Sequence, residues 1–171
     1  MKKINEITEI MKLYAQNPQK GFEQIYKTYS GPLFRYLRSS FSLNKSEAED
    51  ILHSAFLPWV KDPSKCAQID NPAAYMYTSV RNAAFKLKMK KAKECVCSEP
   101  EVSVSHDKLV ENRLIIAKAL ESLPQEQRET IVLKLWSDMT FEEIAQVQQC
   151  TLATAASRYR YAIAKLKELI T

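Results

Sequence analysis

The stretch TFEEIAQVQQCTLATAASRYR, residues 140–160, decides the fold expected for this chain. Thr140 and Glu143 precede an apolar run and are spaced as in a capping box, where each side chain bonds the backbone amide of the other residue. The letters QQC then break the helical spacing, and Thr151 is a candidate cap for a longer helix. Together, the short capped helix, the tight turn and the longer helix have the dimensions of a helix-turn-helix.

The longer helix of this stretch has one apolar face and one polar face. Spacings of three and four place its apolar residues on a single stripe: Leu152, Ala155, Tyr159, Ala162, Leu166 and Leu169. Small and hydrogen-bonding residues lie off that stripe, mostly near the helix N-terminus: Ala153, Thr154, Ser157, Arg158, Arg160 and Tyr161. A recognition helix presents such residues to base edges in the major groove, so DNA binding is expected. A helical hairpin that has only a structural role and binds no DNA could have the same polar outer face.

Helices before this motif complete a block that spans residues 108–171. Apolar residues at helical spacing predict one helix that ends before Pro124, because the residue preceding a proline avoids the helical conformation. Its apolar positions are Leu109, Ile116, Ala119, Leu120 and Leu123. The segment QEQRETIVLKLWSD predicts the next helix, whose apolar positions are Ile131, Val132, Leu135 and Trp136.

Residues 1–90 predict a second helical block. Apolar residues on one stripe mark its first helix, namely Ile4, Ile7, Met11 and Tyr14. After the break NPQKG, a helix from Phe22 to Phe41 follows, and we expect a kink or interruption at Gly31-Pro32.

Two more helices complete this block. Ser46 and Glu49 are spaced as a capping box for the helix EAEDILHSAFLPWV. Pro58 should bend the end of that helix because it has no amide for the carbonyl of Ser54. Turn-forming residues in KDPSKCAQIDN predict a loop, and Pro72 suits the first position of the last helix.

Charge is unevenly distributed along the chain. Residues 1–90 hold 14 basic and 8 acidic residues, and residues 108–171 hold 9 and 8. Six basic residues and no acidic residue lie within residues 81–93, RNAAFKLKMKKAK, which marks a helix suited to phosphate. Residues 91–107 lose the helical spacing and hold 2 basic and 4 acidic residues, so they are expected to be a linker. The predicted fold is therefore all-α, with two small helical domains joined by a flexible linker.

Composition excludes several classes of protein. The chain has no run of about 18 apolar residues and no secretory signal pattern, so we expect a cytoplasmic protein without membrane insertion. Its two histidines, His53 and His106, lie in different blocks, and no glycine-rich phosphate loop occurs. We find no catalytic constellation and expect no enzyme activity and no cofactor.

The four cysteines are too few and too scattered for a disulfide scaffold, and we expect free thiols. Cys95-x-Cys97 with His106 leaves a metal or redox site open as an alternative. One such pair without a second matched pair is a weak signal, so no metal site is predicted.

The order of these motifs resembles that of the sigma-70 family of transcription initiation factors. EAEDILHSAFLPWV resembles the helix that grips the clamp of RNA polymerase, and NPAAYMYTSVRNAAFKLKMKKAK resembles the following helix, which handles the minus 10 promoter element. ALESLPQEQRETIVLKLW and MTFEEIAQVQQCTLATAASRYRYAIAKL resemble the C-terminal domain, which reads the minus 35 element. The two-domain size points to the extracytoplasmic-function subgroup.

The resemblance implies a role for three sets of residues. The polymerase-binding set is Glu49, Asp50, Leu52, Ala55, Phe56 and Trp59. The set for the minus 10 element is Arg81, Asn82, Lys86, Lys88 and Lys90. The set for the minus 35 element is Thr154, Ser157, Arg158, Arg160 and Tyr161. The implied partners are core RNA polymerase, promoter DNA and an anti-sigma factor, since partner control is common in the family.

The chain departs from the family pattern in ways that matter. Gln148-Gln149 stands where Leu-Gly is usual, so Gln149 is expected to adopt the left-handed conformation that glycine takes more easily. Tyr161 and Ile163 stand where arginine is frequent, which weakens phosphate binding. A helix-turn-helix regulator that never engages polymerase is the competing hypothesis, but it leaves the helix from Asp50 to Trp59 without a surface role.

Overall fold

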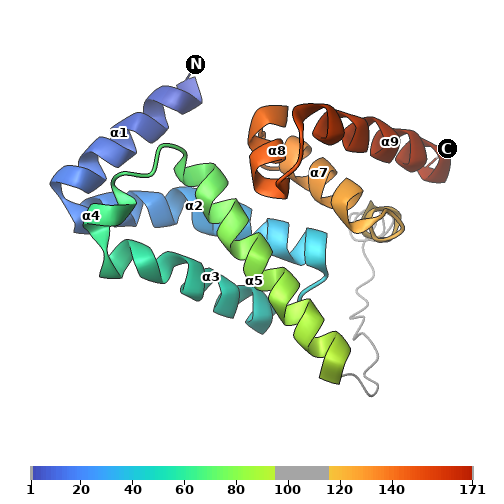
Figure 1. Ribbon diagram of the computed structural model, residues 1–171, viewed down its shortest axis with the longest axis horizontal. Helices are drawn as coiled ribbons and strands as arrows, with labels where there is room; N and C mark the ends of the chain where they lie inside the picture. Colours follow the sequence, from blue (N-terminus) through green and yellow to red (C-terminus); the bar gives the residue numbers. More distant parts are fainter. Residues whose placement is uncertain (1, 95–115, 171) are drawn as a thin grey trace, which may run out of the picture.

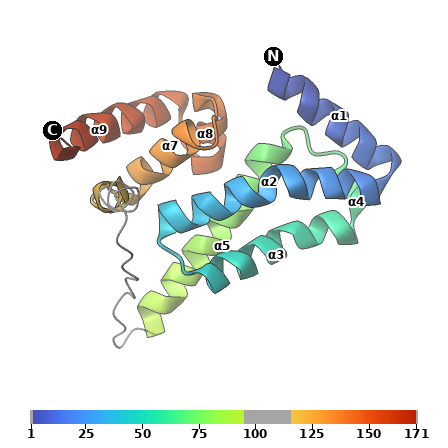
Figure 2. The same cartoon turned by 180° about the vertical axis from the view of Figure 1, so that it is seen from behind.

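Eight labelled helices occur in the computed structural model, which describes residues 2–94 and 116–170; Figures 1 and 2 show them from opposite sides. The first block holds α1 (Lys2–Gln16), α2 (Pro18–Phe41), α3 (Lys45–Lys61), α4 (Pro63–Cys66) and α5 (Pro72–Glu94). Helical residues 116–121, then α7 (Gln125–Leu135), α8 (Phe141–Gln148) and α9 (Leu152–Ile170), form the second. The described residues contain no strand, which confirms the all-α prediction.

The first two helices form a tight hairpin. Asn17 caps α2, and its side-chain oxygen accepts the amide of Lys20 at 3.1 Å. Gly21 faces Tyr14 so closely that a Cβ at Gly21 would overlap the Tyr14 backbone. Burial raises the pKa of Tyr14 to about 12, and its hydroxyl donates to the carbonyl of Trp59 at 2.5 Å. The hairpin is thereby tied to α3.

The interruption expected at Gly31-Pro32 was wrong, because α2 is continuous through Pro32. Tyr29 and Leu33, on either side, are buried in the core, so packing holds the helix where the proline removes one backbone hydrogen bond. Gly31 also has no Cβ to clash with the proline ring, which relieves the usual restriction on the preceding residue.

The predicted start of α3 was also wrong. Asn44, not Ser46, is its N-cap, and the capping box joins Asn44 to Glu47. The Glu47 amide donates to Asn44 at 2.9 Å, and the Asn44 amide donates to the Glu47 carboxylate at 3.0 Å. The amide oxygen of asparagine accepts the bond as a serine hydroxyl would, and Asn44 stands where the chain leaves an extended conformation. Ser46 and Glu49 are both exposed, two residues too late to cap the helix.

The last helix of the first block starts and ends close to the expected positions. Pro72 opens α5, as predicted, after a loop that also contains the short helix α4. The helix continues to Glu94, four residues beyond the predicted domain boundary. Lys91 near its end forms an ion pair with Glu47 of α3. Burial opposes ionisation of Glu47, but hydrogen bonds from Lys91 and the Asn44 amide outweigh it and lower the pKa of the carboxyl.

The two blocks pack together. One continuous apolar cluster contains Trp59, Met76 and Val80 from the first block and Leu133 and Ile144 from the second, all at 0% exposure. A smaller cluster of Leu120, Leu123, Ile131 and Ala162 lies within the second block. The cluster is continuous because α7 lies against α2, and α8 against α5 (Figures 1 and 2).

Two thiols fall in the described ranges, and both are free: Cys66 is buried and Cys150 is half-buried. Cys95, Cys97 and His106, like the predicted linker apart from its first residues, lie outside the described ranges. No helix within residues 2–94 or 116–170 has the length and apolar character that a membrane span needs.

Gly21→Ala should destabilise the protein, because the new methyl group meets the Tyr14 backbone, which cannot move aside as a side chain could. Overpacking of this kind costs about 1–3 kcal/mol, or a fall in Tm of roughly 2–10 °C. Thermal unfolding followed by circular dichroism measures it.

Gly31→Ala is the matched control, since the chain has only two glycines. Its new methyl meets Arg35 Nη1 at an ordinary 3.7 Å. The gain in helix propensity, about 1 kcal/mol, offsets the added contact with the Pro32 ring, so Tm should change little. Equal loss of stability in both variants would show that the close contact between Gly21 and Tyr14 is not the cause.

Candidate nucleic-acid interface

The basic helix α5 has two differently placed sets of cations. Asn82, Lys86 and Lys90 are exposed to solvent. Arg81 and Lys88 are seven residues apart, on the same side of the helix as Phe85, and both are half-buried. The guanidinium of Arg81 lies over the Phe85 ring, 4.6 Å from its centroid. The five residues predicted to hold the minus 10 element are therefore divided between an open face and a covered face.

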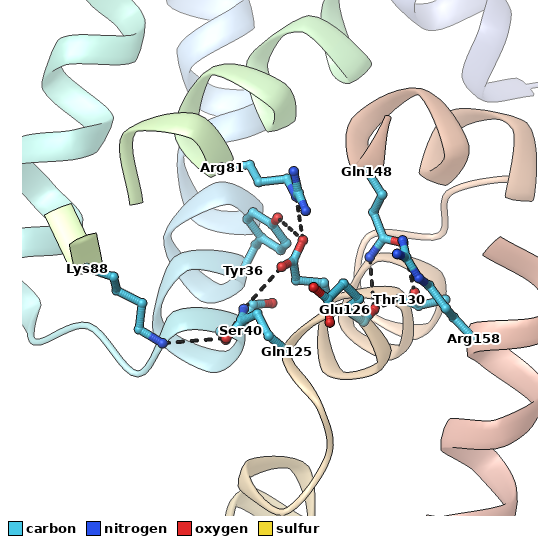
Figure 3. A network of polar contacts seen from close by, with 10 residues as sticks. Tyr36, Ser40, Arg81, Lys88, Gln125, Glu126, Thr130, Gln148 and Arg158 are labelled. Carbon is cyan, nitrogen blue, oxygen red and sulfur yellow. Dashed lines mark hydrogen bonds and ion pairs between the residues drawn. The ribbon is translucent and has the colours of Figure 1, made fainter. Parts of the chain in front are cut away.

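The covered face meets α7 through a network of polar contacts. Arg81 Nε donates to Glu129 Oε2 at 2.6 Å, and the Tyr36 hydroxyl donates to the same oxygen at 3.3 Å. Gln125 Nε2 donates to Glu129 Oε1 at 3.1 Å and to the Ser40 carbonyl at 2.8 Å. Lys88 Nζ reaches Gln125 Oε1 at 3.5 Å (Figure 3). Residues from α2, α5 and α7 thus converge on one carboxylate.

Burial sets the proton affinities in this network. Burial raises the pKa of Tyr36 well above its usual value, and the negative charge of Glu129 adds to this effect. Burial also lowers the pKa of Lys88, and the nearby Arg128 guanidinium lowers it further. The phenol therefore stays a donor to the carboxylate over the physiological range.

The helix-turn-helix predicted from residues 140–160 is present. Thr140 and Glu143 form the predicted capping box of α8. Gln149 ends α8 in the left-handed region, with φ 53° and ψ 48°, as expected from its position. The amide of Cys150 then donates to the Ala145 carbonyl at 3.0 Å, which closes the helix end. Thr151 caps α9 by accepting the amide of Thr154 at 3.1 Å.

The polar face of α9 is open to solvent to different degrees. Arg160 and Tyr161 are exposed, and Thr154, Ser157 and Arg158 are half-buried. Arg158 Nη1 donates to Gln148 Oε1 at 2.9 Å, which fixes the arginine against the preceding helix (Figure 3). Arg160 stacks on Tyr161, with 5.6 Å from its guanidinium carbon to the ring centroid. The five residues predicted for the minus 35 element share one accessible helix surface.

Within α3, the predicted polymerase-binding residues are divided between surface and core. Glu49 and Asp50 are exposed. Leu52, Ala55, Phe56 and Trp59 belong to the core, with exposures of 7%, 8%, 3% and 0%. Their side chains hold α3 in place, so only the other residues of α3 form its surface toward solvent.

Residues that the sequence did not single out complete this surface. His53, Leu57 and Val60 follow Glu49 at helical spacing and are exposed, Leu57 at 47% and Val60 at 58%. Leu57 and Val60 lie off the apolar stripe of α3, so the sequence pattern could have marked them as exposed to solvent. Two tyrosines near the start of α5 also differ in exposure. Tyr75 is 40% exposed, whereas Tyr77 is buried and donates to Ser137 Oγ at 2.8 Å.

Two residues of α7 also carry structural roles that the sequence pattern did not reveal. Arg128 donates to the carbonyls of Leu120, Glu121 and Leu123 at 2.8, 2.6 and 3.2 Å, where the helix of residues 116–121 ends. A cation at a helix C-terminus also balances the helix dipole. Glu129 lies in a stretch that reads as an ordinary polar helix face, QEQRET, so no local signal marks it as buried.

Residues 113–166 match the family model for region 4 of sigma-70. The chain is also 26% identical over 148 residues to an ECF RNA polymerase sigma factor, EcfG, of Rhodopseudomonas palustris, a match that covers 81% of this chain and 80% of that protein. Over residues 113–166 the chain therefore carries the sequence pattern of sigma-70 region 4, and over most of its length it is similar to a sigma factor of the extracytoplasmic-function subgroup.

Solved structures agree with this similarity. The sigma factor RpoE of Bartonella quintana, solved with the anti-sigma factor NepR, has a TM-score of 0.69 and 26% identity, over 88% of this chain and 97% of that chain. CnrH, solved with the cytosolic domain of CnrY, has a TM-score of 0.67 and 22% identity, over 94% of each chain. The likeness to CnrH concerns the fold alone.

We expect Lys86→Ala to weaken binding to all DNA sequences, because an exposed lysine on the open face of a DNA-binding helix contacts phosphate without reading bases. The slope of log affinity against log salt should fall by about 0.9 for the lost phosphate contact. Fluorescence anisotropy over a salt series measures both quantities.

Lys12→Ala on α1, at the opposite end of the first block from the basic end of α5, is the matched loss of one exposed positive charge (Figure 1). Its salt slope should equal that of the unaltered protein. The same fall in slope for Lys12→Ala and Lys86→Ala would show that overall charge, not the open face of α5, is responsible.

Proposed function

We propose that this protein is a sigma factor that binds core RNA polymerase and directs promoter-specific initiation of transcription. The observation that carries the proposal is a capped helix-turn-helix, matched by sigma-70 region 4, on the same chain as a basic helix. The protein acts as a binding protein without catalysis of its own, in the cytoplasm where core polymerase is found.

The minus 35 element is read as duplex by α9. Its N-terminal half enters the major groove, where Thr154, Ser157 and Arg158 contact bases or phosphates and exposed Arg160 contacts a base. Arg158 is held by Gln148, so it is positioned before DNA arrives. A side chain fixed in this way loses less entropy on binding.

The minus 10 element is held by α5. Asn82, Lys86 and Lys90 contact the strand from the open face, and Arg81 and Lys88 add contacts when α7 leaves them. Promoter opening requires bases to leave the stack, at a cost of a few kcal/mol. The loop of residues 62–71 next to exposed Tyr75 is where an extruded base would be captured.

Core polymerase binds α3. Glu49 and Asp50 supply charge at the start of the helix, and Leu57 and Val60 supply apolar area that is open to solvent near its end. An anti-sigma factor is proposed as a further partner, because the 26% identical RpoE was solved with one.

Run-off transcription with core polymerase on genomic fragments tests the function itself. We expect discrete transcripts that depend on the added protein, with co-purification of the protein and core polymerase. DNA binding without any polymerase binding would instead support a helix-turn-helix regulator that acts by itself.

Arg160→Lys should lower discrimination between promoter and random DNA by roughly 5- to 150-fold, because lysine retains the charge but loses the two-pronged contact to guanine. The salt dependence should stay unchanged, since the phosphate charge balance is the same. Competition binding with both DNAs measures the ratio. Equal weakening on both would show that Arg160 contacts only the backbone.

Leu57→Ala should weaken binding to core polymerase roughly fivefold or more by removing exposed apolar area from α3. Leu169→Ala on α9 is the matched control, because Leu169 is 51% exposed on the other block. Titration of labelled core polymerase with each variant measures the affinity. Identical affinities for the two variants would place the polymerase surface elsewhere.

A further inference from the structure

Gln148, the last residue of α8, is a buried polar side chain beside the helix face that is proposed to bind DNA. Only 5% of it is exposed. An amide buried to this extent costs stability unless hydrogen bonds satisfy both its oxygen and its nitrogen. Three contacts do so, and they join α8 to α7 and to α9. Gln148 is therefore placed to orient a side chain of the DNA-binding surface from inside the second block.

The partners of Gln148 fix the direction of its amide. Its Nε2 donates to the backbone carbonyl of Glu126 at 2.9 Å, and a carbonyl can only accept. Its Oε1 accepts Arg158 Nη1 at 2.9 Å, and a guanidinium can only donate. The Thr130 hydroxyl lies 3.2 Å from the same oxygen (Figure 3). A reversed amide would set donor against donor and acceptor against acceptor, so one orientation alone satisfies these partners.

Arg158 lies at the border of the polar face of α9. Ala155 and Ala162, three residues before it and four residues after it, have 0% exposure and belong to the covered face. Ser157 lies about 100° further round the helix, near the middle of the polar face. The bond to Gln148 draws the Arg158 side chain toward α8. Arg158 is thus directed to the edge of the polar face that is nearest to α8.

This edge of α9 is the one that meets the DNA backbone. In a helix-turn-helix, the second helix lies in the major groove and the first helix crosses the backbone. A cation directed toward α8 therefore faces phosphate oxygens at the edge of the groove. The bond to Gln148 uses Nη1 of Arg158, and the guanidinium carries two more donor nitrogens, Nε and Nη2, on a different edge. Two parallel donors of this kind match two phosphate oxygens.

We propose that Gln148 is a positioning residue for DNA binding, which acts by directing Arg158 onto a phosphate at the edge of the minus 35 site. Thr130 and the Glu126 carbonyl of α7 fix the amide of Gln148, and Gln148 fixes the guanidinium of Arg158. Arg158 sets the position of α9 in the groove, and Arg160 reads a base. This inference rests on the proposed function, because it assigns different DNA contacts to the two arginines of α9.

Loss of Gln148 has a different effect from loss of the charge that it directs. Without Gln148, Arg158 keeps its charge but must be immobilised when DNA binds, which lowers the affinity roughly 2- to 10-fold. The number of neutralised phosphates stays the same, so the slope of log affinity against log salt stays the same. Loss of Arg158 itself removes one phosphate contact and should lower that slope by about 0.9.

Gln148→Leu removes the acceptor for Arg158 and places an apolar side chain of similar size in the buried position. The Thr130 hydroxyl still reaches the Glu126 carbonyl at 2.7 Å, so it keeps a partner. Gln146→Leu is the matched control, because it makes the same change on the same helix at an exposed residue whose side chain contacts the first block. Arg158→Ala removes the cation. Circular dichroism verifies the helix content and Tm of each variant.

Fluorescence anisotropy with the full chain over a salt series tests the inference on two probes. One is a duplex that the unaltered protein selects from a randomised library, and the other is a duplex with the same bases in scrambled order. Gln148→Leu should lower the affinity for both duplexes by the same factor, roughly 2- to 10-fold, with an unchanged salt slope. Gln146→Leu should bind as the unaltered protein does. Added to Arg158→Ala, Gln148→Leu should cause no further loss, because the side chain that it positions is gone.

Several results would overturn the inference. Equal affinities for Gln148→Leu and the unaltered protein would show that Arg158 needs no positioning. Weaker binding to the selected duplex alone would show that Arg158 reads a base. A loss that persists in the Arg158→Ala background would show that Gln148 acts only on the folding of α8. Failure of the proposed function would look different, because the unaltered protein would then select no duplex and direct no run-off transcripts, and the inference would fail with it.

Discussion

The buried carboxylate of Glu129 is the constraint on which the packing of the two blocks depends. A charge with no solvent exposure must be paired and hydrogen-bonded, or it costs several kcal/mol. Three donors supply this pairing, Arg81 and Tyr36 from the first block and Gln125 from α7 itself. Because two of the three come from the other block, the charge is satisfied only when the blocks are together.

The same constraint gives the protein two distinct kinds of surface. Hydrogen bonds fix the direction of two arginine side chains before any ligand binds: Arg81 bonds Glu129, and Arg158 bonds Gln148. The two bonds have opposite consequences for DNA binding, because Arg158 remains on an accessible helix face and Arg81 is covered. Pairing therefore positions one proposed DNA contact and withholds the other.

Local patterns predicted the elements well where one physical signal dominated. The capping box at Thr140, the left-handed Gln149 and the cap at Thr151 each depend on residues within a few positions, so the sequence predicted all three. Local patterns were wrong where two signals competed. Asn44, not Ser46, caps α3 because the chain enters the helix at Asn44. The packing of Tyr29 and Leu33 in the core keeps α2 continuous through Pro32.

By itself the sequence determined the helical class, the helix-turn-helix and the location of basic charge, because these arise from periodicity, caps and composition over short distances. Only the tertiary structure decided which side chains of a functional helix face solvent. Phe56 and Trp59 entered the core while Leu57 and Val60 stayed exposed, and Arg81 separated from Lys86 on one helix. The reason is that burial depends on which face a distant helix covers, and residues 36, 81 and 129 meet through packing that no local pattern encodes.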